Sequence, residues 1–125
     1  MVREGYPAAS VEEYLDLVPP DQGAALRVVR DRLVAVVPDA EQVISYQVPT
    51  IRYRGAGLVA LSVAKEHCSL HLMSPPLARS LAGTLTEGRL SGATLHFDAA
   101  TPLSEATVRL VATRRMAEVD ARLDH

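Results

Sequence analysis

The residues best suited to metal chemistry are two histidines, His67 and His71, with Cys68 beside the first. Imidazole nitrogen and thiolate sulfur are common ligands of zinc and iron. In a helix, imidazoles four positions apart converge on one ion. In a strand they share a face but lie roughly 13 Å apart, and Cys68 points to the opposite face. The choice between helix and strand therefore decides whether these three residues can form a local metal site.

A strand is the better prediction, because polar and apolar residues alternate from His67 to Met73. A metal bound there then needs a second imidazole from another strand. His96 lies in a separate predicted strand, and cross-strand neighbours are about 5 Å apart between their β-carbons. The sequence leaves two interpretations open: a two-histidine zinc or iron site in which His96 joins His67 or His71, or ordinary histidines on a sheet face.

Two arginines, Arg52 and Arg54, alternate with Ile51 and Tyr53. In a strand, this spacing places both guanidinium groups on one face or edge of the sheet. Guanidinium groups bind carboxylates and phosphates through paired hydrogen bonds, so this surface could hold a small anion or an acidic partner segment. The alternative is that edge-strand arginines only discourage aggregation. The predicted ligand-binding residues of this face are Arg52, Arg54, His67, His71 and His96.

Acidic residues near the start of the chain, Glu12, Glu13 and Asp16, form a candidate metal site. Hard and borderline cations prefer oxygen ligands, although exposed carboxylates outside a rigid loop bind them weakly. The alternative needs no metal. Ser10 and Glu13 have the spacing of a capping box, and negative charge is favourable in the first turn of a helix.

Signatures of the common enzyme classes are missing from the sequence, which has no nucleophile elbow, zinc-protease motif or Walker loop. The segment 55–60, Gly-Ala-Gly-Leu-Val-Ala, matches the dinucleotide fingerprint in form. Both of its flanks are predicted strands, however, so a hairpin turn is the better interpretation. Cys68 is predicted to be a buried, poorly nucleophilic thiol. We predict no catalytic residues and favour a binding protein over an enzyme.

Hydrophobic periodicity and breaking residues divide the chain into helices and strands. Helices are predicted from Val11 to Val18, from the Pro19–Pro20 pair to Pro38, and from Ser104 to about Arg122. The predicted strands are Gln42–Tyr46, Thr50–Arg54, Leu58–Ala64, His67–Met73 and Ala93–Phe97, with a short helix over Pro75–Leu81. This order predicts an α+β fold, with a single antiparallel five-stranded sheet and N- and C-terminal helices packed on one face.

Composition excludes several classes of protein. The chain has 125 residues, 48% hydrophobic and 22% charged, which predicts one globular domain over residues 1–125. Its net charge of −2 argues against nucleic-acid binding. No apolar run approaches the roughly 20 residues that cross a bilayer, so no membrane association is expected. The single cysteine cannot form an internal disulfide, which is typical of a cytoplasmic protein.

Several stretches carry a family resemblance: residues 11–15, 18–20, 38–46 and 52–55, with Pro49 between the last two. Together with the order of elements, they resemble the bacterial YdhG-like domain of unknown function, which is grouped with frataxin-like and YjbR/CyaY-like proteins. Gln47 stands where this family has glycine, and Gly92 and Ala93 stand where it usually has lysine and glycine. The resemblance covers nearly the whole chain and implies an arrangement of helices and sheet similar to frataxin.

The resemblance also implies a function, because some YdhG-like proteins are described as iron chaperones. By this analogy the chain is an iron-binding or iron-chaperone protein. The alternative is a non-enzymatic small-molecule (anion) or peptide-binding module that uses the open sheet face. Either function leaves room for a protein partner.

Overall fold

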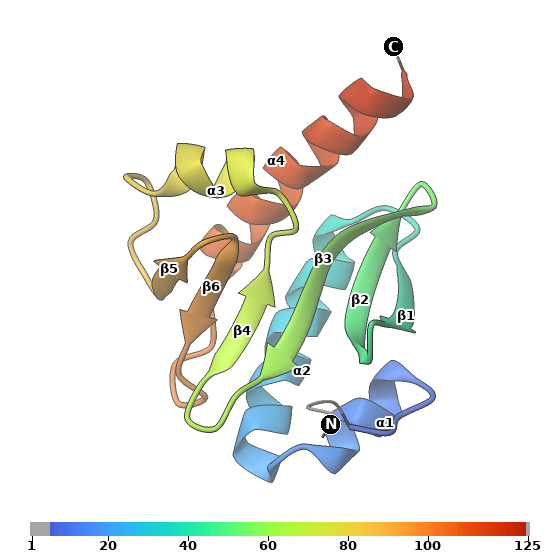
Figure 1. The fold of residues 1–125 in the computed structure, drawn as a ribbon, viewed down its shortest axis with the longest axis vertical. Coiled ribbons are helices and arrows are strands. Elements are labelled where there is room, and N and C mark those ends of the chain that lie inside the picture. Colours follow the sequence, from blue (N-terminus) through green and yellow to red (C-terminus); the bar gives the residue numbers. More distant parts are fainter. Residues whose placement is uncertain (1–5, 125) are drawn as a thin grey trace.

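One antiparallel sheet of six strands forms the centre of the fold in the computed structural model, which describes residues 6–124. The strands lie in the order β1-β2-β3-β4-β6-β5 (Figure 1). Their bounds are β1 Glu41–Ser45, β2 Val48–Tyr53, β3 Ala56–Val63, β4 Cys68–His71, β5 Arg89–Ser91 and β6 Thr94–Phe97. All of them except β5 match predicted strands to within a few residues.

The prediction of five strands is wrong, because the sheet has a sixth strand, β5. It has three residues and pairs with β6 through a two-residue turn, and glycines with positive φ angles, Gly88 at 75° and Gly92 at 59°, stand beside its two ends. Glycine adopts such angles without steric cost, so these residues allow a short hairpin arm. Three residues are too few to show a recognisable alternation of polar and apolar side chains. The α+β class itself is confirmed.

Two long helices, α2 (Pro20–Val36) and α4 (Glu105–Leu123), cover one face of the sheet, and the other face is open toward the viewer in Figure 1. Helix α1 (Val11–Leu17) lies near the turn between β1 and β2, and α3 (Pro75–Leu81) lies near the opposite end of the sheet. Within the described residues, no helix is both long and apolar enough to cross a bilayer.

The core lies between the sheet and the two long helices. Leu61, Leu70 and Leu95 are cross-strand neighbours on β3, β4 and β6, and all three are fully buried on the helix-covered side. Side chains alternate between the two faces of a strand, so the residues between these leucines face the open side. The open face therefore carries two polar rows across the same strands, namely Ser62, Ser69 and His96 in one row and Ala60, His71 and Thr94 in the other.

Helix α1 begins with the predicted cap. The Ser10 hydroxyl accepts a hydrogen bond from the Glu13 amide at 3.1 Å. The Glu13 carboxylate accepts from the Ala9 amide at 2.7 Å, one residue before the amide that an ideal capping box uses. Glu13 thus has a structural partner at the start of the helix.

Candidate functional site

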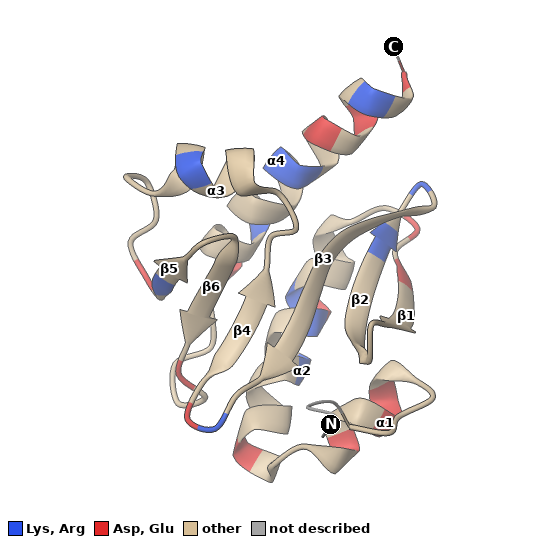
Figure 2. Cartoon of the chain, viewed as in Figure 1, with Lys and Arg blue, Asp and Glu red and all other residues tan. Residues whose placement is uncertain are grey.

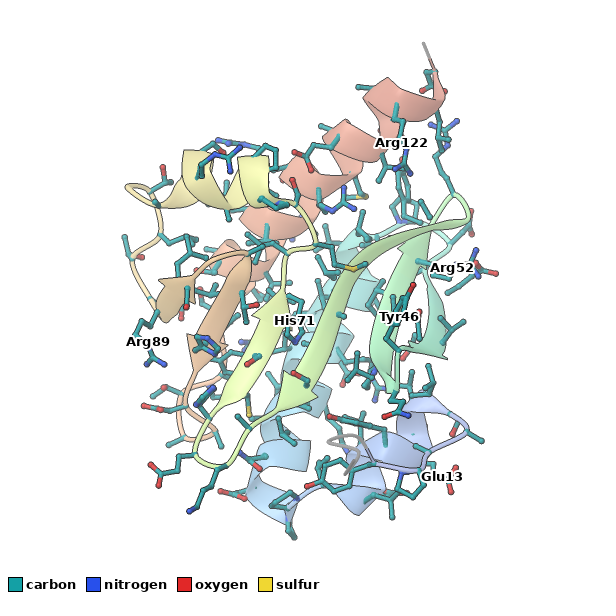
Figure 3. All side chains as sticks on the ribbon, viewed as in Figure 1. Glu13, Tyr46, Arg52, His71, Arg89 and Arg122 are labelled. Atoms are coloured by element: carbon teal, nitrogen blue, oxygen red, sulfur yellow. The ribbon has the colours of Figure 1, made fainter. Side chains whose placement is uncertain are left out.

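A hollow of about 460 Å³ lies on the open face of the sheet. Its lining comes from the β1–β2 hairpin, from β3, from β4 and the segment that follows it, and from one side chain of α1. Figure 3 shows two of the lining residues, His71 at the centre of the face and Tyr46 in front of β2. The full lining is Tyr14, Ser45, Tyr46, Gln47, Val48, Thr50, Ala60, Ser62, Val63, His71 and Met73.

Two polar side chains of the hollow, Ser62 and His71, belong to a hydrogen-bonded chain of three that ends at Thr94 on β6. The Ser62 hydroxyl on β3 lies 2.7 Å from Nε2 of His71 on β4, and Nδ1 of the same ring lies 3.2 Å from the Thr94 hydroxyl on β6. Burial lowers the pKa of His71, and the nearby His96 lowers it further. His71 is therefore neutral at pH 7, with one ring nitrogen free of a proton.

The rest of the hollow is mainly apolar. Val48, Ala60, Val63 and Met73 contribute aliphatic and thioether surface. Tyr14 closes one end, where its hydroxyl accepts a hydrogen bond from an amide of β3 at 3.3 Å. Figure 2 shows no charged residue on β3, β4 or β6. The hollow thus combines apolar walls with a few neutral polar side chains, as small-molecule sites commonly do.

Tyr46 occupies a costly backbone position at the edge of the hollow. It and Gln47 are the two central residues of the β1–β2 turn, with φ angles of 52° and 71°. Such angles suit glycine or asparagine, and they strain a tyrosine. The Tyr46 side chain is 96% exposed, so packing does not explain its presence. Strained residues of this kind cluster at ligand-binding sites.

The predicted arginines separate from each other. Arg52 lies on a second hollow of about 430 Å³, which shares Ser45, Tyr46, Thr50 and Met73 with the first. Its guanidinium donates to the Gly55 carbonyl at 2.5 Å and lies 3.9 Å from the Glu41 carboxylate, with part of the side chain exposed. An anionic group at the edge of the main hollow would share this guanidinium with Glu41.

Arg54 does not join this face, contrary to the predicted spacing. It stands in the β2–β3 turn with a φ angle of 54°, outside the strand in which alternation would place it. Its guanidinium donates to Asp120 at 2.8 Å and to Asp124 at 3.0 and 2.8 Å, both on the last turns of α4 or just beyond. The pKa of Asp124 is lowered by this hydrogen bond. Arg54 is thus engaged in holding the turn to the helix.

His67 and His96 meet on the same open face, in a separate hollow of about 310 Å³. This is the cross-strand approach that the sequence predicted for His96. Ser69 lies 3.0 Å from Nδ1 of His96. Burial is the main cause that lowers the pKa of His96, and the nearby His67 and Arg89 lower it further. His71 does not line this hollow, so the three histidines do not form one site.

Cys68 to His71 form strand β4, and His67 is the residue before it. The segment does not form a local metal centre. Cys68 is fully buried on the helix side while His71 faces the open side. Burial raises the pKa of the Cys68 thiol to about 11, as expected for an unreactive core cysteine. Among residues 6–124, no group of three or more His, Cys, Asp or Glu side chains is arranged to hold a metal ion.

The acidic residues of α1 have arginine partners. Arg27 donates to Glu12 at 2.6 Å and to Asp16 at 2.5 Å, and Arg30 donates to Glu12 at 2.7 Å. These hydrogen bonds lower the pKa of Glu12. A cation bound through these paired oxygens would compete with the guanidinium groups for them.

Of the residues that line the main hollow, sequence analysis named only His71 as a ligand contact. It missed the others, among them Tyr46, Ser62 and Met73, and also Thr94, which contacts His71 from β6. Ser62 lies in a strand whose other residues are small or apolar, so nothing in the sequence singled it out. The only signal for Tyr46 was the absence of glycine from a tight turn. These residues are recognised as parts of one site only when the register of β3, β4 and β6 is known.

Comparison with solved structures identifies the fold. The chain is similar to a crystal structure of a protein of the DUF1801 family, YdhG, from Bacillus subtilis. The TM-score is 0.78, and the match covers 90% of this chain and 91% of that one at 13% sequence identity. No family model and no curated protein matches the sequence. The YdhG-like fold expected from the resemblance is confirmed, and the frataxin-like grouping is not supported by these comparisons.

Proposed function

We propose that the protein is a YdhG-like small-molecule-binding module that holds its ligand in the hollow around His71. The observation that carries this proposal is the Ser62–His71–Thr94 chain at the edge of apolar surface on an otherwise uncovered sheet face. The imidazole, bonded on both sides, fixes the position of the Ser62 hydroxyl at the surface of the hollow, and the apolar lining supplies most of the contact area.

The lining also indicates the class of ligand. A flat, largely apolar molecule fits between Tyr46 and the floor at Ala60, because an exposed tyrosine can close over an aromatic or aliphatic surface. A hydroxyl group of the ligand would donate to the Ser62 oxygen, because both ring nitrogens of His71 are already in hydrogen bonds. A carboxylate or sulfonate at its other end would reach Arg52 in the adjoining hollow.

This proposal ranks above iron binding for a physical reason. Both carboxylate oxygens of Glu12 and Oδ1 of Asp16 are paired with Arg27 or Arg30, and Glu13 caps α1. Iron would have to compete with these contacts at an exposed helix surface. The hollow on the sheet requires no such displacement.

The test uses anilinonaphthalene sulfonate, a fluorescent probe that combines aromatic rings with a sulfonate. We expect saturable fluorescence enhancement and shifts of the Thr50, Ser62 and Met73 amide signals in NMR spectra. In the variant Ala60→Leu, the larger side chain occupies the floor of the hollow, because Ala60 lies in its lining. We expect this variant to bind the probe about tenfold more weakly, a loss of roughly 1.4 kcal/mol.

The matched control is Ala106→Leu, which makes the same substitution at an exposed position of α4. It should bind the probe like the parent protein. Thermal unfolding of both variants separates a filled hollow from a damaged fold. Probe binding that is unchanged in a folded Ala60→Leu protein contradicts the proposed site.

A further inference from the structure

We propose that Ser62 is a nucleophile toward activated carboxylic esters bound in the main hollow, with His71 as its general base and Thr94 as the positioning residue. This inference rests on the proposed function, since the ester must occupy the same hollow. It adds a chemical step that simple binding does not require.

The geometry is that of an activated hydroxyl. The Ser62 oxygen lies 2.7 Å from Nε2 of His71, within the distance at which a base removes a proton. A third group orients the base, because Thr94 lies 3.2 Å from Nδ1. A nucleophile, a base and an orienting residue in contact are the structural signature of nucleophilic catalysis.

The hydrogen bonds from Ser62 through His71 to Thr94 all run in one direction when the imidazole proton is on Nδ1. The ring then donates to the Thr94 hydroxyl and accepts from the Ser62 hydroxyl at Nε2. The lowered pKa of His71, caused by burial and by His96, keeps the ring neutral and able to accept a proton near pH 7. Both Ser62 and His71 line the hollow, so an ester carbonyl can approach the hydroxyl.

The step transfers an acyl group. The Ser62 oxygen forms a bond to the ester carbonyl carbon while its proton passes to Nε2 of His71. The bond from that carbon to the leaving alkoxide or phenolate breaks, and the leaving group takes the proton from His71. A water molecule then attacks the acyl carbon and gives a proton to Nε2. The bond from that carbon to the Ser62 oxygen breaks, the serine oxygen takes the proton back from His71, and the carboxylic acid is released.

A second serine on the same sheet supplies a matched control. Ser69 lies directly across from Ser62 in the β3–β4 pair, and its hydroxyl is 3.0 Å from Nδ1 of His96. Ser69 is only 4% exposed, whereas Ser62 is at the surface of the hollow. Because the ester cannot reach the buried Ser69 hydroxyl, we expect Ser69 not to be acylated.

The experiment treats the whole protein with p-nitrophenyl acetate, records the release of nitrophenolate and maps acetyl groups by mass spectrometry of peptides. We expect one acetyl group on Ser62 and none on Ser69. The Ser62→Ala and His71→Gln variants should lose this acetylation, with nitrophenolate release about 100-fold slower, the usual contribution of a general base. The Ser69→Ala variant should react like the parent protein.

Thr94 is tested by rescue. We expect Thr94→Val to react more slowly and Thr94→Ser, which keeps the hydroxyl, to recover the parent rate. Acetylation confined to exposed side chains such as Lys65 or Tyr46, in a protein that still binds anilinonaphthalene sulfonate, overturns this inference and leaves the proposed function standing. Failure of the probe to bind in the main hollow overturns both.

Discussion

The imidazole rings of His67 and His96 meet edge to face, with their centroids 4.4 Å apart. His67 immediately precedes β4, and His96 lies on the neighbouring strand β6. Arg89, the cross-strand partner of His96 on β5, adds a permanent positive charge beside them. Protonating both rings therefore places like charges side by side on the open face.

The first prediction is that lower pH destabilises the fold through the histidines of this face. His71 and His96 have pKa values below their ordinary 6.5 in the folded protein, in both cases mainly because of burial. The unfolded chain then binds more protons than the folded one just below this pH. Their contribution to stability is complete above pH 6.5 and is lost as pH falls through that value toward the lowered pKa values.

Urea unfolding between about pH 7.5 and about pH 5.5 measures this effect, since histidine titrates in that interval. The free energy of unfolding should decrease with falling pH in the parent protein. It should decrease less in His96→Gln, and least when His71→Gln is added. An equal decrease in the parent and the double variant rules out these histidines as the cause.

The second prediction concerns the strained turn. Tyr46→Asn should raise the free energy of unfolding by about 0.5 kcal/mol, because asparagine tolerates a positive φ angle better than tyrosine. The same variant should bind anilinonaphthalene sulfonate more weakly, since Tyr46 lines the hollow. Tyr46→Phe keeps both the strain and the ring, so it should match the parent in both measurements. Stabilisation without weaker binding indicates that the strain has no connection with the ligand.

The third prediction concerns a buried arginine. Arg115 on α4 donates to the backbone carbonyls of Leu58 at 2.9 Å and Gly57 at 3.0 Å, next to the irregular pairing of β2 and β3. Arg115→Met keeps the aliphatic stem but removes the donors, and it should cost about 3 kcal/mol of stability. Chemical denaturation measures this loss. The adjacent, exposed Arg114→Met should change stability by less than about 0.5 kcal/mol.

The fourth prediction concerns the strand that sequence analysis missed. A β-carbon added at Gly88 would lie 2.8 Å from the His96 carbonyl oxygen, and the residue has a φ angle of 75°. Gly88→Ala should therefore destabilise the protein by about 2 kcal/mol and weaken amide-exchange protection in β5. Gly83→Ala is the control, since nothing lies within 4 Å of a β-carbon there. Equal protection of β5 in both variants contradicts the role assigned to Gly88.

Local sequence patterns predicted the helices and strands because side-chain alternation and helix capping depend on residues that are close in the sequence. The alternation from His67 to Met73 correctly separated the buried Cys68 from the open-face His71. The starts of α1 and α4 followed from caps, in which a serine hydroxyl accepts from an amide three residues later. The same reasoning failed for Arg54, because alternation assumes that the strand continues, while the chain turns at that residue.

The main hollow was beyond prediction for a different reason. Ser62, His71 and Thr94 come together only through the register of three strands, which depends on long-range pairing and on how each turn closes. The sequence places each residue on a face but does not say which residue stands opposite. His71 was therefore predicted as a ligand contact, while its two hydroxyl partners were not recognised.

The last prediction concerns the proton on His71. Nitrogen-15 NMR of the ring distinguishes a protonated from an unprotonated nitrogen, and we expect the proton on Nδ1 and an unprotonated Nε2 at pH 7. The Ser62 hydroxyl then donates to Nε2, as nucleophilic attack requires. Thr94→Val removes the acceptor at 3.2 Å and should shift the ring toward the other tautomer. Ser69→Ala leaves both contacts of His71 in place and should not. A proton on Nε2 in the parent protein contradicts the assignment of His71 as the base for Ser62.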